Sequence, residues 1–548
     1  MVALIGTLPW LSGRDPALTI LRAKSADQEA TPEALAAIRA ELGLADGPLV
    51  MLGRWLGGLL QGDTGVSWIS GRPVLPGMLS ALGVSLTLMG FAVAVALVVA
   101  ALICVPTARR ALTGRDARTS GAVAATLTAL PEFLLAAVVL VVGAVWLGWL
   151  PPYGWDGPSY AVLPALALGL PAGGLLGRLF ADGMAGTCAE GWVATWRTVG
   201  VGRLRLLGAV VRRTLPGLSS QIALTLVGLT GGAVAVEKVF AIPGLGRATL
   251  GAAIAQDIPA LQTGILLLLG VALTLGALAE VARRLLLGPA LHSGAMPVAG
   301  PGPRGTRWVV PALTGLALVG LVAAGLPRDP YATRHARLQA PGLALPLGAD
   351  ASGRDLLARV AHGALNTVAV ALLVVAVCLA LGLALGLLPR AAAGPIELTT
   401  ATPPVIAGLL VAAVTGGSVA GAAVAVALVS WAPLAAHTAA LVEEARAAPH
   451  VAIAPVLGVG PVRLAVRYLL PAACGPVVRH ALLRLPGITL ALAALGFLGL
   501  GPQPPRPEWG LVLAEGMPYV ERAPWAVLTP SVGLVLLSAL AVSSSSLS

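Results

Sequence analysis

The chain has 548 residues, of which 57% are hydrophobic and only 11% are charged. A soluble domain carries about 25% charged residues, so the composition excludes a water-soluble globular protein. The formal net charge is +11. The basic clusters lie between apolar runs, which is typical of the positive-inside rule rather than of nucleic-acid binding. These runs are continuous and lack the alternation of a barrel wall, which favours membrane-spanning helices.

The first polar stretch covers residues 13–72 and follows an apolar start too short to cross a bilayer unaided. We expect this stretch to form an extramembrane loop on the outer side. It contains a predicted amphipathic helix over Thr31 to Leu44. Thr31 suits the N-cap, Pro32 suits the first helical position, and Gly43 is expected to mark the end.

Five apolar spans follow the loop, and the Arg-bearing segments between them are expected to face the cytoplasm. The most basic of these segments lies at about 185–216, with five arginines between Arg197 and Arg213. A stretch rich in Gly and Pro at 288–307 has the composition of a linker. The spans predicted in this first half are Met78–Val105, Ala122–Leu150, Tyr160–Ala181, Leu218–Val236 and Leu261–Leu287.

The same order of elements begins again after the linker. A span precedes a polar stretch at about 327–359, and three spans, a basic segment at about 443–484 and two last spans follow. The sequence therefore predicts an all-α polytopic membrane protein with two tandem homologous bundles of about five or six spans each, at residues 1–287 and 308–548. The spans predicted here are Trp308–Leu326, Leu365–Leu388, Ile396–Val414, Val419–Val442, Pro486–Leu500 and Trp525–Val542.

A local match between the halves supports the duplication. A Gly-Arg pair precedes a polar-to-apolar transition in each half, at Gly71 and at Gly353. The polar residues of the two transitions are Ser85, Thr87, Asn366 and Thr367. The second external loop opposes the positive-inside rule, so the orientation rests on the first half and on counting spans. The arginines of that loop are Arg328, Arg334, Arg337, Arg354 and Arg359.

The basic segment of the first half carries a pattern that runs from Ala189-Glu190-Gly191-Trp192 through Arg197-Thr198-Val199-Gly200 to Leu215-Pro216. This pattern resembles the cytoplasmic loop of permeases of binding-protein-dependent ABC importers, in the dipeptide, oligopeptide and nickel branch. In that family the loop forms short helices that dock in a groove of the ATPase. The stretch from Val236 to Gly246 is similar to the branch's signature after the fifth span.

The second half resembles the partner permease of the same branch. The stretch from Leu347 to Asp355, the spacing from Gly458 to Pro471, and the run from Phe497 to Pro505 match that permease in order. This loop departs from the family pattern, because Ala452 stands where Glu is usual and Pro455 where Arg is usual. We expect it to dock more weakly, or through Glu443, Glu444 and Arg446 instead.

The resemblance implies two permease subunits fused in one chain, in the cytoplasmic membrane. The expected partners are two cytoplasmic ATPase subunits, an extracytoplasmic substrate-binding protein and the lipid bilayer, with no nucleic acid. The expected cargo is a small solute of the peptide, nickel or metal-chelate class. The chain lacks a Gly-x-x-x-x-Gly-Lys-Ser/Thr loop, so we expect a transport protein that is not itself an enzyme and needs no cofactor. The alternatives are an ion-gradient-driven secondary transporter and a degenerate, non-transporting membrane scaffold.

The resemblance also assigns the residues that couple the permease to the ATPase. Gly200 and Gly458 supply a positive φ at a helix end, and Pro216 and Pro471 are expected to begin the next helix. No catalytic residue, metal ligand or substrate contact is assigned. The predicted coupling residues are Glu190, Arg197, Gly200, Arg203, Pro216, Gly458, Arg463 and Pro471. Ionisable residues placed in or near spans, which are loose candidates for the transport pathway, are Glu132, Arg178, Glu237 and His437.

Overall fold

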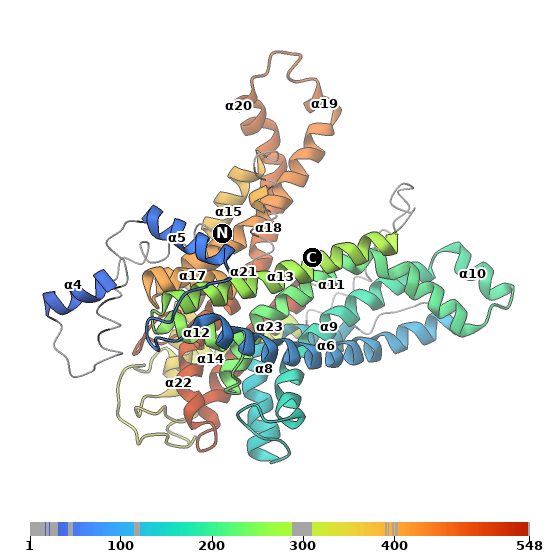
Figure 1. Cartoon of the computed structure of the whole chain (residues 1–548). Coiled ribbons are helices and arrows are strands. Elements are labelled where there is room, and N and C mark those ends of the chain that lie inside the picture. The colour runs from blue at the N-terminus through green and yellow to red at the C-terminus, as the bar shows by residue number, and fades with distance from the viewer. Residues whose placement is uncertain are drawn as a thin grey trace. The chain divides into compact units, whose positions relative to one another are not determined.

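A computed structural model of the chain has helices as its regular elements in the part that it describes (Figure 1). This confirms the predicted all-α fold class. The predicted linker at 288–307 and the predicted helix end at Gly43 lie outside the described residues. The described residues are Ala17, Leu21, 31–41, 48–113, 121–287, 309–388, Ala392, 394–396, Thr399 and 404–545.

The first predicted permease unit contributes ten labelled α-helices and a π-helical turn to this described part. They are α4 (Pro32–Glu41), α5 (Pro48–Leu60), α6 (Val74–Thr113), α7 (Gly121–Ala129), α8 (Glu132–Val139), η2 (Leu140–Trp146), α9 (Pro158–Cys188), α10 (Gly191–Thr198), α11 (Arg203–Val239), α12 (Leu245–Ile254) and α13 (Ile258–Leu287). The predicted N-cap of α4 is confirmed, because the Ala34 N–H donates to Thr31 Oγ1 at 3.2 Å. The described part of this helix runs to Glu41, and the predicted end at Leu44 lies outside the described residues.

The second predicted unit contributes the remaining described elements. They are α14 (Val309–Gly325), α15 (Leu356–Gly386), α17 (Pro404–Thr415), α18 (Val419–Ala447), α19 (Pro449–Ala452), α20 (Pro461–Leu464), η4 (Ala465–Leu469), α21 (Leu470–Leu498), α22 (Trp509–Gly516), η5 (Met517–Tyr519) and α23 (Trp525–Ser545).

Seven of the described helices are long and apolar enough to cross a membrane, and they overlap seven of the predicted spans. Four shorter apolar helices occupy the other predicted spans at Glu132–Trp146, Pro311–Gly325, Pro404–Thr415 and Trp525–Leu540. The predicted span Ala122–Leu150 is interrupted, because α7 ends at Ala129 and α8 begins after Pro131. Proline has no N–H to continue the helical hydrogen bonds, so the helix is interrupted there.

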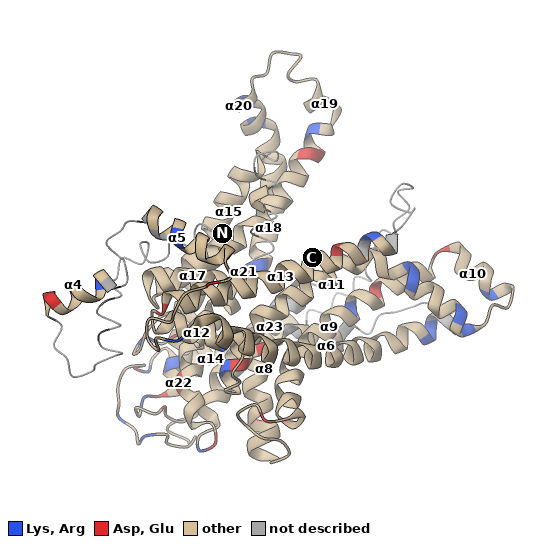
Figure 2. Ribbon diagram, in the orientation of Figure 1, with Lys and Arg blue, Asp and Glu red and all other residues tan. Residues whose placement is uncertain are grey.

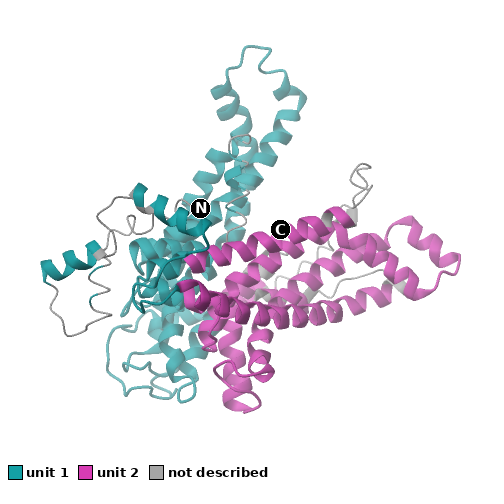
Figure 3. Ribbon diagram, in the orientation of Figure 1, with its two compact units in different colours: residues 1–73, 250–262, 318–534 teal, residues 74–249, 263–317, 535–548 magenta. Residues whose placement is uncertain are grey.

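The described chain forms two compact units (Figure 3). Unit 1 consists of residues 1–73, 250–262 and 318–534, and unit 2 consists of residues 74–249, 263–317 and 535–548. Unit 2 contains α6 to α11 from the first predicted permease unit, and unit 1 contains α15 to α22 from the second. The predicted boundaries at 287 and 308 stay a prediction.

Small residues allow long helices to approach closely within each unit. In unit 2, Gly169, Gly173 and Gly177 form a row on α9 that faces α6. In unit 1, Gly382 and Gly386 of α15 face α18 in the same manner. A Cβ at any of these five glycines would lie between 2.4 and 2.9 Å from an atom of the facing helix. This is the small-residue packing that is typical of membrane helices, where van der Waals contact replaces the hydrophobic driving force.

A buried network of charges explains arginines that the positive-inside rule leaves unexplained. Arg359 is fully buried at the start of α15, and its Nη1 lies 2.7 Å from Asp350 Oδ2 and 2.5 Å from Glu515 Oε2. Arg354 Nε contacts the same Asp350 oxygen at 2.7 Å. Two arginines of the second external loop are therefore held by carboxylates in a structural ion-pair network, which gives them a role in the fold of this loop.

Candidate functional site

The predicted first coupling loop forms a turn-helix-turn that we call the first elbow, residues 189–202. It lies between the C-terminal end of α9 and the start of α11, with α10 at its centre (Figure 1). Glu190 is the N-cap of α10, but its side chain does not cap the helix. Instead Glu190 Oε2 accepts a hydrogen bond from Trp192 Nε1 at 2.7 Å and lies 3.5 Å from Arg213 Nε on α11. This clamp, formed by Glu190, Trp192 and Arg213, joins the start of the elbow to α11.

A single buried side chain anchors α10 to the helices on either side. Val193 is buried in a small apolar core with Met184 of α9 and with Leu206 and Val210 of α11. The other described side chains of α10 are half-buried or exposed. A displacement of α10 is therefore transmitted to α9 and α11 through Val193, because close-packed apolar contacts resist compression.

The first elbow ends in a left-handed turn, as predicted for Gly200. Its φ is +81°, a conformation that glycine adopts without the steric cost of a Cβ. The Gly200 N–H donates to Arg197 O at 3.1 Å and the Val201 N–H donates to Trp196 O at 3.0 Å. These two bonds form a Schellman motif, which closes the helix and satisfies its last carbonyls. Gly202 then serves as the N-cap of α11.

The second elbow, residues 448–460, repeats this ending. Gly458 has a φ of +85°, as predicted, and its N–H donates to Pro455 O at 3.0 Å. The Val459 N–H donates to Ala454 O at 3.1 Å, and Gly460 is the N-cap of α20. The two halves therefore share one Schellman motif, and each motif is followed by the same Val-Gly dipeptide.

The anchoring residue is repeated as well. Val451 stands seven residues before Gly458, as Val193 stands before Gly200. It is buried in a core that it shares with Val442 of α18, and the other members of this core are Leu469, Ala473 and Val477. Sequence reasoning missed both valines, although alignment on the two glycines would have placed them at the same position.

The two elbows differ in how firmly they are held. Helix α19 has only four residues, because Pro455 replaces the residue at the position of Arg197 and cannot continue the helical ladder. The clamp is also missing. Counted from the two glycines, the positions of Glu190, Trp192 and Arg213 are taken in the second half by Ala448, His450 and Pro471.

Both elbows expose apolar side chains at matching positions. Val199 and Leu204 are 77% and 87% exposed, and Leu457 and Val462, at the same distances from their glycine, are 73% and 75% exposed. Figure 2 shows Lys and Arg gathered around the α10 end of the long helices. An exposed apolar tip with a basic surround is typical of a docking surface for another protein.

The structure places the remaining predicted coupling residues unequally. Arg197 is half-buried in the last turn of α10, and its Nε donates to Val193 O at 3.4 Å. Arg203 begins α11 and Arg463 lies in α20, and both are exposed. Glu443, Glu444 and Arg446, suggested as alternative docking residues, are exposed near the end of α18.

The prediction that Pro216 begins a helix is wrong. Pro216 lies inside α11, which starts at Arg203 directly after the elbow. Its neighbour Ser219 donates a side-chain hydrogen bond to Pro216 O at 2.8 Å. This bond does not replace the one that the proline removes, which would reach the carbonyl four residues earlier, but membrane helices tolerate an interior proline where neighbouring groups satisfy the freed carbonyl. Pro471 does stand in the first turn of α21, but α20 and η4 lead into that helix without a loop.

A second repeated feature lies away from the elbows. In unit 2, the Ser85 hydroxyl of α6 donates to Glu237 Oε1 at 2.5 Å, and Glu237 Oε2 accepts from the Arg247 N–H at 2.9 Å in the first turn of α12. In unit 1, Thr367 Oγ1 of α15 reaches Glu508 Oε1 at 3.4 Å, and Glu508 caps α22. Each carboxylate therefore fixes a short helix to the first long helix of its unit.

Sequence reasoning named Glu237 loosely and missed Glu508. The signal was present, because Ser85 and Thr367 both stand fourteen residues after the glycine of the repeated Gly-Arg pair.

Of the other ionisable candidates, Glu132 is the first residue of α8. Arg178 Nε lies 3.9 Å from Asp182 Oδ2 with both side chains partly exposed. The His437 ring lies 4.9 Å from the ring of His480 on α21.

Fold and site together define a multi-pass membrane protein with two copies of a protruding, glycine-ended elbow. Residues 117–287 and residues 365–547 each match the family described as "Binding-protein-dependent transport system inner membrane component". The chain therefore belongs to this family and is a non-enzymatic permease of an ABC importer, with two permease units in one polypeptide. Membership implies ATPase and substrate-binding partners.

Curated relatives align with one part of the chain at a time. The chain is 37% identical to the di/tripeptide transport system permease protein DppC of Pseudomonas aeruginosa, over 36% of this chain and 67% of that protein. It is 30% identical to the metal-staphylopine import system permease protein CntB of Staphylococcus aureus, over 53% of this chain and 92% of that protein. It is 32% identical to a putative peptide transport system permease protein of Brucella abortus, over 47% of this chain and 82% of that protein.

Proposed function

We propose that this chain forms both halves of the transmembrane path of an importer in the cytoplasmic membrane. Two separate ATPase subunits dock on the cytoplasmic side, one at each elbow. The observation that carries the proposal is the repetition of one elbow geometry, with the same left-handed glycine, the same buried valine and the same exposed apolar positions. A transporter that uses one ATPase subunit or none has no need for two such elbows.

The geometry supports a mechanical role for the elbows. Closure of the ATPase pair on ATP displaces α10 and the turn that contains Gly458. The Val193 core passes that displacement to α9 and α11, and the Val451 core passes it to α18 and α21. The long helices then tilt and open the path to the outer side, which is alternating access by rigid-body motion.

The names of the relatives support a small solute as cargo. The Pseudomonas and Brucella relatives are named for peptide transport and the Staphylococcus relatives for metal-staphylopine import. We therefore propose a peptide or a metal chelate, with nickel included through the branch that the sequence resembles. An extracytoplasmic binding protein delivers this cargo to the outer side.

The test is association with ATPase subunits in a reconstituted system. Leu204→Glu combined with Val462→Glu places a charge in each apolar tip without touching a buried residue. We expect this double variant to lose ATPase binding by at least tenfold in pull-down and titration experiments on nanodiscs. Leu343→Glu, an equally exposed leucine of the second external loop, is the control and should bind as wild type does. Equal binding by both variants contradicts docking at the elbows.

A further inference from the structure

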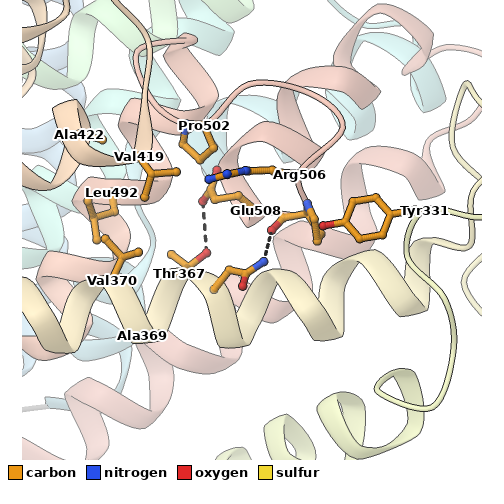
Figure 4. Close-up of a pocket in the computed structure, with 12 residues that line it drawn as sticks. Tyr331, Thr367, Ala369, Val370, Val419, Ala422, Leu492, Pro502, Arg506 and Glu508 are labelled. Atoms are coloured by element: carbon orange, nitrogen blue, oxygen red, sulfur yellow. Dashed lines mark hydrogen bonds between the residues drawn. The ribbon is translucent and has the colours of Figure 1, made fainter. Parts of the chain in front are cut away.

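Unit 1 contains a cavity of about 320 Å³ beside the buried carboxylate Glu508 (Figure 4). Helices α15, α18 and α21 and the loop before α22 form its walls. One side is apolar, with Val370, Val419 and Leu492. The other side is polar and carries Arg506 with Asn366, Thr367 and Tyr331. A concave site with apolar walls and a few convergent polar groups is the usual form of a small-molecule site, and this volume is at the lower end of the usual range.

Arg506 is the charged group that this cavity offers to a ligand. Its side chain extends along the cavity beside Pro502 and is exposed. Within the part of the chain that the structure describes, no carboxylate forms an ion pair with its guanidinium. Asn366 holds the same loop in place, since its Nδ2 donates to Pro507 O at 3.0 Å. The guanidinium is therefore available for a planar anion on a loop that α15 supports.

Glu508 does not cancel this positive charge by pairing with it. Its oxygens accept from the Gly510 N–H at 2.9 Å and the Leu511 N–H at 2.8 Å, and Thr367 lies at 3.4 Å. Burial raises the pKa of Glu508 to about 7, although these hydrogen bonds act to lower it. Near neutral pH a large fraction of this carboxyl is therefore uncharged, which weakens its repulsion of an anionic ligand.

The corresponding place in unit 2 is filled. The space beside Ser85 and Glu237 measures only about 10 Å³, and Leu86 and Met89 of α6 are among the side chains around it. Arg247 there is engaged by the backbone, because its Nη1 donates to Ala241 O. Of these two repeated carboxylate sites, only the one in unit 1 has room for a ligand.

We propose that the unit 1 cavity is a transit site for the carboxylate group of a small, partly apolar solute. Arg506 binds the carboxylate in the planar, two-bond geometry that guanidinium groups favour. Asn366 and Tyr331 offer neutral polar contacts, and the wall of Val370, Val419 and Leu492 packs against the apolar body. The proposal rests on the proposed import function, of which it specifies the cargo and a contact inside the permease.

The experiment measures binding of two matched probes to the full chain in phosphatidylcholine nanodiscs. The probes are leucyl-leucine, which has a free carboxylate, and leucyl-leucinamide, which lacks one. We expect the acid to bind at least tenfold more tightly than the amide, since hydrogen bonds between a guanidinium and a carboxylate are about twice as strong as those between neutral groups. Arg506→Gln should remove this preference. Arg522→Gln, which replaces an exposed arginine outside the cavity, is the control and should retain it.

A second variant tests the volume rather than the charge. Ala369 is an exposed residue on the cavity wall, and Ala369→Phe should weaken binding of the acid while Arg506 remains in place. Absence of detectable binding, equal binding of acid and amide, or unchanged preference in Arg506→Gln each overturns the proposal. ATPase-subunit binding is measured on the same samples. Absence of ATPase binding by the wild-type chain would contradict the importer assignment separately. Both variants should bind the ATPase subunits as wild type does, because Arg506 and Ala369 lie outside both elbows.

Discussion

Replacing Gly200 by alanine tests the elbow geometry directly. The φ of +81° at Gly200 lies in the left-handed region, where an L-residue costs about 1–2 kcal/mol. No atom lies within 4 Å of the position that an added Cβ would take, so backbone strain is the whole expected penalty. Gly458 has a φ of +85° and the same open surroundings, so its alanine variant should carry an equal penalty.

Each elbow provides its own control two residues later. Gly202 has a φ of −56° and a ψ of 139°, and Gly460 has a φ of −65° and a ψ of 160°, which any residue adopts. Both positions are also open to a Cβ. Gly202→Ala and Gly460→Ala should therefore behave as wild type. Gly200→Asn should fall between Gly200→Ala and wild type, because asparagine tolerates the left-handed conformation better than other residues with a side chain.

The assay is titration of nanodisc-embedded chain with its ATPase subunits. A strain of about 1–2 kcal/mol shifts the equilibrium away from the docking-competent elbow by roughly 5- to 30-fold, and the apparent affinity falls by up to that factor. We expect that loss for Gly200→Ala and no change for Gly202→Ala. If the two variants bind equally well, the left-handed exit does not present the elbow and the reasoning is refuted.

Three further changes test other parts of the structure. Glu190→Ala removes the clamp of the first elbow, worth about 1 kcal/mol, and should speed hydrogen exchange of the α10 amides roughly fivefold; unchanged exchange would contradict the clamp. Arg359→Met removes one of the two arginines that neutralise Asp350 and Glu515, so the network keeps one negative charge in excess, and it should destabilise by about 3–5 kcal/mol in thermal melts. Arg328→Met, which breaks a more exposed pair, should cost under about 1 kcal/mol. The melting temperature of Glu508→Gln relative to wild type should rise between pH 4.5 and pH 7, a result that a pH-independent difference would exclude.

The sign for Glu508 follows from its protonation. Its pKa is raised from 4.5 to about 7 by burial, so the folded state holds a proton that the unfolded state has released between these pH values. Stability therefore falls as the pH rises through this range, by roughly 3 kcal/mol at most. A glutamine has no proton to lose and avoids this loss. Its single oxygen can accept from only one of the Gly510 and Leu511 N–H groups, a cost that does not change with pH.

The spans and the glycine exits could be predicted because their signals are local. The length of an apolar run is enough to predict a membrane span. A glycine before a Val-Gly dipeptide indicates a helix end within a few residues. The contact between Glu190 and Arg213 could not be predicted in the same way. It depends on how α10 folds back against α11, which no local pattern encodes.

Pro216 and the cavity show two further limits. A proline is read as a helix start because it lacks an N–H, but neighbouring side chains can supply the bonding that keeps a long membrane helix continuous. The cavity at Arg506 depends on the volumes of side chains from several helices. The sequence shows an arginine in a Pro-rich loop, but it does not show that the space beside it is open, whereas the space beside Glu237 is filled.

The features that the two halves share close a helix, satisfy backbone groups or fill one packed contact, and the features that differ do none of these. The left-handed glycine, the buried valine and the carboxylate at a short helix recur because each satisfies backbone groups or packs one fixed contact. The clamp at Glu190 is found in one half and the open cavity in the other, and neither is needed to close a helix. A duplicated permease therefore keeps the geometry of its elbows and of its short-helix contacts in both copies, while its surfaces and cavities are free to diverge.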